Sequence, residues 1–249
     1  MIGICGDCGV VLHRLALATG LRCHQIVSLH ELAEQMNSWT MIVYLAGARA
    51  LARGEEIARF VASAHCMLIA VVPAERRALR DIVQLAKHDG QLVIAMQGLC
   101  SIEEVIVRRR KNRRTETPVH RVLTHLATHV GSDHALISAA AALLGLRRVR
   151  ADALPHWLER PERSVRRMLA EAGLPSPSDY PALFTGAYVA FDTEVLDRSF
   201  RDVAIDRGFA STDELRRYLV TRTGVSPTAW TKLGFERALD LATFPRVRA

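Results

Sequence analysis

The chain is poor in aromatic residues and has no long apolar run. Aromatic side chains make up 6% of its 249 residues, against 49% hydrophobic and 24% charged residues. This balance is typical of an ordinary globular protein with a largely aliphatic core. No apolar stretch approaches the roughly 20 residues that cross a bilayer, and the start, MIGICGDCGVV, lacks the basic leader of a signal peptide. We therefore expect a cytoplasmic protein with no membrane partner.

Cysteine is scarce and confined to the first half of the chain. The five cysteines, an odd number, are Cys5, Cys8, Cys23, Cys66 and Cys100. Without an export signal, this number does not indicate a disulfide framework. Cys5 and Cys8 form one C-x-x-C pair, but no second pair completes a zinc site, and His125 and His129 lack the carboxylate of an H-E-x-x-H motif. We predict no metal and no cofactor.

Acidic residues are fewer than basic ones. The chain has 33 Lys and Arg against 26 Asp and Glu, a formal net charge of +7, which favours an anionic partner such as nucleic acid. The densest basic run is RRRKNRR, at residues 108–114. The alternation of strand-like and helix-like segments stops there, and blocks of like charge are usually exposed connectors. We predict a domain of residues 1–107, a basic linker of residues 108–117 and a second domain of residues 118–249.

The first domain alternates short apolar runs with amphipathic stretches. The runs MIGIC, CHQIVS, MIVYLAG, CMLIAVVP and QLVIAMQG have the length and the Ile and Val content of buried strands. Between them, segments such as residues 29–39 have apolar residues at helical spacing. Because parallel neighbours need a crossover helix, this alternation predicts an α/β domain with a five-stranded parallel sheet.

In element order and length this half resembles a response-regulator receiver, a flavodoxin-like fold. A phosphorylatable receiver needs an aspartate at the end of its third strand, with further acidic residues for Mg²⁺. Here that strand ends in Ala46 and Gly47, and Asp7 is a lone carboxylate after the first strand. We expect a pseudo-receiver that senses a signal or forms a homodimer, without phosphorylation.

Residues 199–230 are the most informative part of the second domain. Phe200, Val203 and Ala204 have the spacing of a short amphipathic helix, and Gly208 permits a sharp turn. Ser211 then caps a second helix with an inward stripe of Leu215, Tyr218 and Leu219. Its outward face consists of Thr212, Asp213, Arg216 and Arg217. A short helix, a glycine turn and a second helix with outward basic residues form a helix-turn-helix, whose second helix fits a major groove.

This segment resembles the second helix-turn-helix of the AraC-type transcriptional regulators. The matching residues are Val203, Ala204, Gly208, Phe209, Leu215, Arg217, the G-x-S-P element Gly224, Val225, Ser226 and Pro227, and Trp230. The resemblance implies an all-α tandem helix-turn-helix domain with a second motif upstream. It also implies a linking helix between the motifs, here at about residues 181–196, and no catalytic residues.

Residues 163–180 are expected to hold the upstream recognition helix and the turn that follows. The buried stripe would be Val165, Met168, Leu169 and Ala172. The outward side chains would be Arg163, Arg166 and Arg167. Pro155 and Pro161 depart from the family pattern, and since proline removes an amide donor, the first helix of this motif must be short or begin at Pro155.

These features together predict a sequence-specific regulator that binds double-stranded DNA, with its two recognition helices in successive major grooves, and that catalyses nothing. The predicted DNA-binding residues are Arg163, Arg166, Arg167, Thr212, Asp213, Arg216 and Arg217. Two alternatives stay open. The first is a nucleotide-binding or redox enzyme that uses the turn with Gly3, Gly6 and Gly9, although Ile4 stands where a G-x-G-x-x-G motif requires glycine. The second is a protein-interaction adaptor that has lost DNA binding.

Overall fold

The computed structural model contains two compact units, Met1–Thr128 and His129–Ala249. It describes residues 2–5, 22–26, 29–34, 41–45, 56, 57, 59, 67–72, 76–85, 92–96, 118–130, 132–148 and 153–244. The predicted basic linker, residues 108–117, lies outside the described residues, as do Gly6, Asp7, Cys8 and Gly9. The second unit begins later in the chain than the predicted helical domain, which starts at residue 118.

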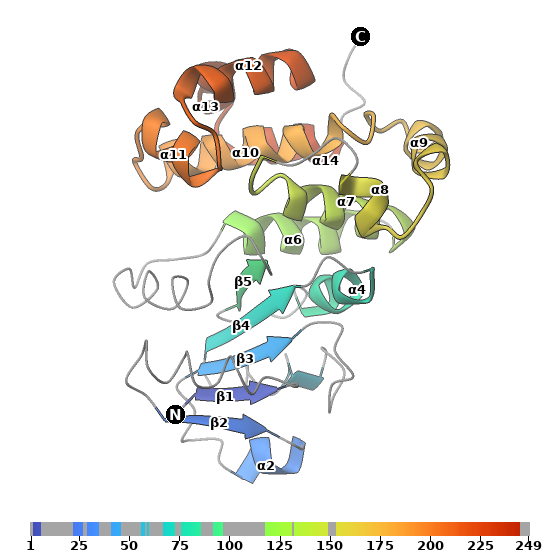
Figure 1. Cartoon of the computed structure of the whole chain (residues 1–249), viewed down its shortest axis with the longest axis vertical. Helices are drawn as coiled ribbons and strands as arrows, with labels where there is room; N and C mark the ends of the chain where they lie inside the picture. The colour runs from blue at the N-terminus through green and yellow to red at the C-terminus, as the bar shows by residue number, and fades with distance from the viewer. Residues whose placement is uncertain are drawn as a thin grey trace. The chain divides into compact units, whose positions relative to one another are not determined.

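The first unit contains a sheet of five parallel strands. They are β1 (Ile2–Cys5), β2 (Cys23–Ile26), β3 (Met41–Leu45), β4 (Met67–Val72) and β5 (Leu92–Met96), in the order β2-β1-β3-β4-β5 (Figure 1). Ile4 pairs with Gln25 on one side and with Val43 on the other. This strand order is found in flavodoxin-like sheets. That the unit belongs to the receiver class stays a prediction.

Three helices of this unit have described bounds: α2 (Leu29–Glu34), α4 (Arg76–Leu85) and α6 (Pro118–His129). Leu79 and Ile82 of α4 are fully buried, and the helix packs against β4. Pro118 is the first residue of α6, where a proline gives up no helical hydrogen bond.

The described part of the second unit is helical. Its helices are α7 (Ser132–Leu144), α8 (Ala153–Trp157), α9 (Glu162–Glu171), α10 (Tyr180–Glu194), α11 (Phe200–Asp206), α12 (Thr212–Thr223), α13 (Pro227–Leu233) and α14 (Phe235–Thr243). α10 is the central helix, since it contacts α7 and α11 to α14 and is buried from Tyr180 to Asp192. None of the described helices is long and apolar enough to span a bilayer.

Hydrogen bonds from hydroxyl groups connect α10 to α7 and to the residue that follows it. The hydroxyls of Tyr180 and Ser138 lie 2.7 Å apart, Thr185 donates to the carbonyl of Gly145 at 2.9 Å, and Tyr188 donates to the carbonyl of Ala142 at 3.0 Å. On the side toward α13, the indole ring of Trp230 lies where a Cβ on Gly186 would be. Glycine at position 186 therefore allows α13 to approach α10 closely.

Candidate nucleic-acid interface

Two helix pairs of the second unit are joined by turns with the same backbone hydrogen bonds. In the turn between α8 and α9, the amides of Leu158, Glu159 and Arg160 donate to the carbonyls of Leu154, His156 and Pro155 at 3.0–3.1 Å. In the turn between α11 and α12, the amides of Arg207, Gly208 and Phe209 donate to those of Val203, Ile205 and Ala204 at 2.9–3.0 Å. Each turn thus closes its first helix with the paired bonds of a Schellman motif.

The two turns also share a left-handed residue at the same place. Glu159, the second residue after α8, has φ of 51°, and Gly208, the second residue after α11, has φ of 80°. A positive φ is easy for glycine and strained for glutamate. The glycine therefore marks the turn between α11 and α12 in the sequence, whereas no glycine marks the turn between α8 and α9.

The two prolines of the first motif are compatible with this geometry. Pro155 is the third residue of α8, where the missing N–H would have no partner within the helix. Pro161 is the N-cap of α9, and its carbonyl accepts hydrogen bonds from Ser164 and Val165 at 2.9 and 3.1 Å. The first helix is short, as predicted, although it begins at Ala153 and not at Pro155.

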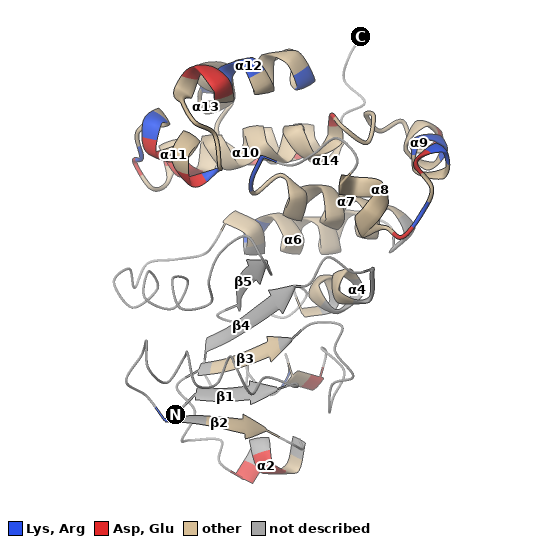
Figure 2. Ribbon diagram, viewed as in Figure 1, with Lys and Arg blue, Asp and Glu red and all other residues tan. Residues whose placement is uncertain are grey.

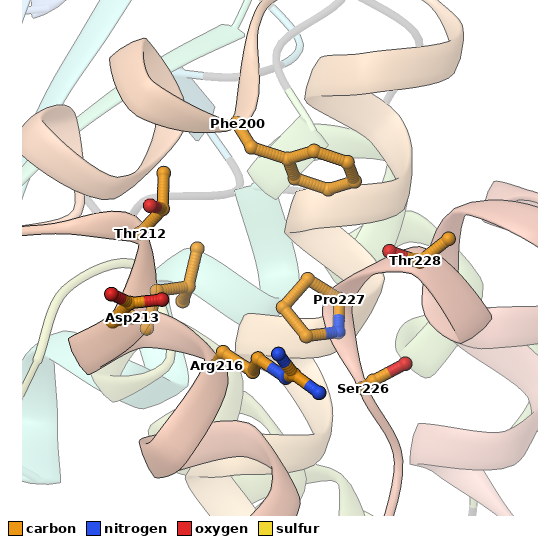
Figure 3. A pocket seen from close by; sticks show the side chains of 8 residues that line it. Phe200, Thr212, Asp213, Arg216, Ser226, Pro227 and Thr228 are labelled. Atoms are coloured by element: carbon orange, nitrogen blue, oxygen red, sulfur yellow. The ribbon is translucent and has the colours of Figure 1, made fainter.

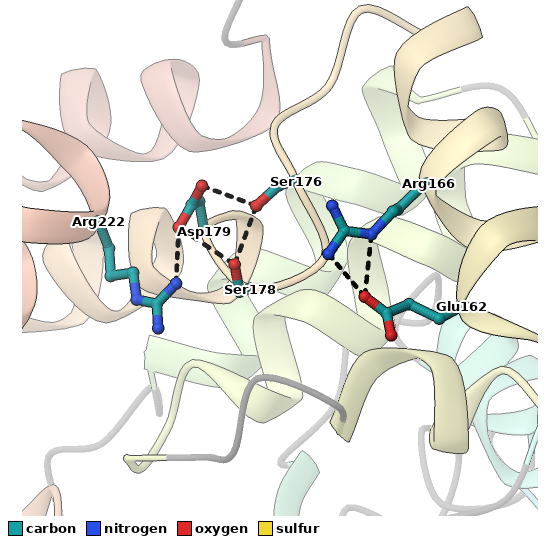
Figure 4. Close-up of polar contacts among 6 residues, drawn as sticks. All are labelled: Glu162, Arg166, Ser176, Ser178, Asp179 and Arg222. Atoms are coloured by element: carbon teal, nitrogen blue, oxygen red, sulfur yellow. Dashed lines mark hydrogen bonds and ion pairs between the residues drawn. The ribbon is translucent and has the colours of Figure 1, made fainter.

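α9 has the predicted division between buried and exposed faces. Val165, Leu169 and Ala172 are buried, while Met168 is only half-buried. The three predicted arginines, Arg163, Arg166 and Arg167, are exposed. Two of them form ion pairs one helical turn away, Arg166 with Glu162 at 2.6 Å (Figure 4) and Arg167 with Glu171 at 3.8 Å. Among the described residues, no carboxylate pairs with Arg163.

α12 begins with a capping arrangement that leaves its outer face free. The Ser211 hydroxyl accepts the amide of Glu214 at 3.2 Å, and the Glu214 carboxylate accepts the amide of Ala210 at 2.7 Å and pairs with Arg148. This is close to the S-x-x-E capping box, which the sequence contains and the prediction overlooked. The four predicted outward residues, Thr212, Asp213, Arg216 and Arg217, are all exposed.

The inner face of α12 is buried against its neighbours. Leu215 and Leu219 are fully buried. Tyr218 is half-buried, and its ring centroid lies 5.2 Å from that of Phe209 in the turn. Burial raises the pKa of the Tyr218 hydroxyl above its usual range. This face therefore holds α12 in place, and its outer face is the part that can contact a partner.

The turn of the second motif is anchored by a buried ion pair. Arg207 donates to Asp192 of α10 at 2.6 Å and to the carbonyl of Leu146 at 3.0 Å, and it lies over the Tyr188 ring at 5.0 Å. The amide of Arg148 donates to the carbonyl of Arg207 at 2.8 Å. Sequence reasoning missed these residues, because a turn arginine gives no sign in the sequence that it points inward.

A second polar cluster secures the far end of α12. Arg222 donates to Asp179 at 3.2 Å, and Asp179 accepts hydrogen bonds from Ser176 at 2.7 Å and from Ser178 at 3.3 Å (Figure 4). The cluster connects the last turn of α12 to the segment before α10. Both ends of α12 are thus held by charged contacts to other parts of the unit.

A pocket of about 360 Å³ lies beside the first half of α12. Its lining residues are Phe200, Thr212, Asp213, Leu215, Arg216, Ser226, Pro227 and Thr228 (Figure 3). Three of the predicted residues, Thr212, Asp213 and Arg216, therefore share one cavity, whereas Arg217 is not part of its lining. Thr228 was not predicted as a site residue, because only the packing of α13 on α10 brings it next to α12.

α9 and α12 carry both signs of charge (Figure 2). α12 has Arg216, Arg217 and Arg222 with Asp213 and Glu214, and its two acidic residues lie in its first turn. Negative side chains there stabilise the helix dipole. Among the described residues, no three His, Cys, Asp or Glu side chains form a group that could hold a metal ion.

Comparison of the chain with protein-family models, with curated proteins and with solved structures finds no match. A proposal for its function must come from the motifs and the geometry of the second unit.

Proposed function

We propose that the chain is a sequence-specific DNA-binding transcriptional regulator of the AraC type, which reads DNA with α9 and α12. The observation that carries the proposal is the repeated short turn: the three backbone hydrogen bonds, which also close α9, are followed by a second helix after only residues 158–161 between α8 and α9 and residues 207–211 between α11 and α12. Two helix pairs with the same turn, each followed by a helix with exposed arginines, are the arrangement of a tandem helix-turn-helix.

The size and chemistry of α12 suit a major groove. A helix with its side chains is about 10–12 Å wide, close to the groove width of about 12 Å. Arg217 is exposed and, among the described residues, has no acidic partner, so its guanidinium is free to form paired hydrogen bonds with guanine. Thr212 and Asp213, the other two predicted residues of α12, are exposed in its first turn.

The arginines of α9 support a weaker or secondary contact. Arg166 and Arg167 are paired with glutamates one turn away, and the side chains of these pairs are 55–74% exposed. Exposed pairs of this kind stabilise a helix by only about 0.3–0.5 kcal/mol, so a phosphate can replace either glutamate at little cost. Arg163 has no acidic partner among the described residues, so it can contact a phosphate without first leaving an ion pair.

The relative direction of α9 and α12 does not fit the predicted insertion of both helices into successive major grooves of straight DNA. In Figure 1, α9 is seen nearly end-on, while α12 runs across the view. Successive major grooves of straight DNA are related by one helical turn and take parallel helices. We therefore expect a duplex that engages both helices to be bent. We expect α12 to make the main contact, because Arg166 and Arg167 of α9 are already paired with glutamates.

The first unit has a regulatory part in this proposal. A receiver-like domain without the phosphorylatable aspartate would sense a signal by another route or join two copies of the chain, in a cytoplasmic regulator. Dimerisation would place two readers on repeated or inverted half-sites, and the arginines of the linker would add contacts to phosphates.

The test is selection of duplexes from a random library by the full-length protein, repeated with Arg216→Ala/Arg217→Ala. The control is Arg237→Ala, which removes an exposed cation of α14. We expect one enriched sequence, lost with the first variant and kept with the control. Binding that is sequence-blind and disappears at moderate salt would leave only a basic surface and would contradict the proposal.

A further inference from the structure

The pocket beside α12 is lined by only one of the two neighbouring arginines of that helix. Arg216 lines the pocket together with Ser226 and Thr228, which lie at the start of α13 (Figure 3). Arg217, the next residue, is exposed but outside the lining. The two side chains leave the helix about 100° apart, so they can contact different parts of a DNA duplex.

The pocket contains hydrogen-bond donors that the protein does not use. The Ser226 hydroxyl accepts the amide of Ala229 at 3.2 Å, and this leaves its own hydrogen free to donate. Thr228 is exposed, and in the described part of the chain neither its hydroxyl nor the Arg216 guanidinium has a hydrogen-bond or ion-pair partner. One cation and two hydroxyls can therefore donate to a single acceptor group.

The geometry of the major groove decides which DNA group meets this pocket. A single helix fills the groove, so when α12 is inserted, the adjacent α13 cannot enter beside it, and any contact that α13 makes with the duplex is with the sugar–phosphate backbone. A pocket between α12 and α13 then faces the backbone. Contacts to phosphates set the register of a protein on DNA and carry no direct sequence information.

We propose that this pocket binds one phosphodiester group of the DNA through Arg216, Ser226 and Thr228, while Arg217 contacts base edges. The inference rests on the proposed function and divides its two central arginines into a backbone contact and a base contact. Asp213 lines the same pocket and repels anions in general. Free phosphate is therefore held poorly, and a phosphate is accepted only where the bound duplex presents it.

The experiment measures the affinity of the full-length protein for two fluorescein-labelled duplexes over a range of potassium chloride concentrations. One duplex is the sequence selected by the unmodified chain, and the other is its scrambled counterpart. Arg216→Ala should weaken both duplexes by the same factor, about tenfold, and lower the slope of log affinity against log salt by about one. Arg217→Ala should weaken the selected duplex far more than the scrambled one, by roughly 5- to 100-fold.

Two further variants keep the test independent of folding and of bulk charge. Thr228→Val removes one pocket hydroxyl without changing charge or size, and we expect a loss of about two- to fivefold on both duplexes with an unchanged salt slope. Arg237→Ala removes one exposed cation of α14 and should change affinity for neither duplex by more than about twofold.

The outcomes separate this inference from the proposed function. If the unmodified chain discriminates between the duplexes but Arg216→Ala abolishes that discrimination, Arg216 reads bases and the pocket assignment is wrong, while the function stands. If Thr228→Val leaves both affinities unchanged, the pocket is likewise not the phosphate site. If the unmodified chain prefers neither duplex, the proposed function fails and the pocket assignment fails with it.

Discussion

Removing the charge of Asp192 should destabilise the second unit far more than removing that of Asp206. Both carboxylates pair with an arginine at nearly the same distance, 2.6 Å to Arg207 and 2.5 Å to Arg198. They differ in burial, since the side chains of the first pair are 8% and 3% exposed and those of the second 29% and 30%. The two pairs thus form a matched comparison.

The expected magnitudes follow from this difference. Asp192→Asn leaves the Arg207 guanidinium buried beside Tyr188 without a counter-ion, and such a change costs about 3–5 kcal/mol of unfolding free energy. Asp206→Asn breaks a solvated pair and should cost less than about 1 kcal/mol. In an Arg207→Met background, Asp192→Asn should cost much less than in the unmodified chain, because no buried charge is left unpaired.

The assay is urea unfolding of the full-length variants, followed by far-UV circular dichroism and by tryptophan fluorescence. Two of the three tryptophans, Trp157 and Trp230, lie in the second unit. The two signals should give the same order of stability. If Asp192→Asn costs no more than Asp206→Asn, or if its cost is the same in the Arg207→Met background, the buried pair does not anchor the turn and the reasoning fails.

Three further predictions concern single positions. Glu159→Gly should raise the unfolding free energy by up to about 1 kcal/mol and Gly208→Ala should lower it by about 1 kcal/mol, because both positions have a positive φ. Gly186→Ala should cost about 1–3 kcal/mol or more, because the new Cβ would overlap the Trp230 ring. Burial raises the pKa of Tyr188 above its ordinary value of 10.0, so its contribution to stability is constant below about pH 10 and falls above it, by about 1.4 kcal/mol per pH unit.

Each of these predictions has its own control, measured by the same urea unfolding. Gly186→Ala should cost less in a Trp230→Phe background than in the unmodified chain, and an equal cost would show that the ring is not the cause. Tyr188→Phe should make the decline above pH 10 less steep, because one proton fewer is kept by the folded chain and released by the unfolded one. Part of the decline remains, since burial also raises the pKa of Tyr180 and Tyr218. An unchanged slope would argue against a buried tyrosine there, and a destabilising Glu159→Gly would contradict the equivalence of the two turns.

Local sequence patterns were sufficient to predict the buried helix faces, the cap and the turn in residues 199–219 of the second unit. The apolar spacing of residues 199–219 predicts which faces of α11 and α12 are buried, because a helical period leaves few alternatives once the core side is apolar. Ser211 and Gly208 mark a cap and a turn through their own chemistry. The spacing of Glu162 and Arg166 also allows their ion pair to be predicted, since residues four apart are neighbours on a helix.

Only the tertiary structure decided which polar groups of distant segments meet. Arg207 and Asp192 are 15 positions apart, and the burial of their pair depends on how the turn packs on α10. Thr228 reaches the side of α12 because Gly186 lets Trp230 approach α10 closely. Periodicity and capping depend on residues a few positions apart, so they can be recognised in the sequence. A pocket or a buried ion pair depends on how whole helices pack, so no local pattern predicts it.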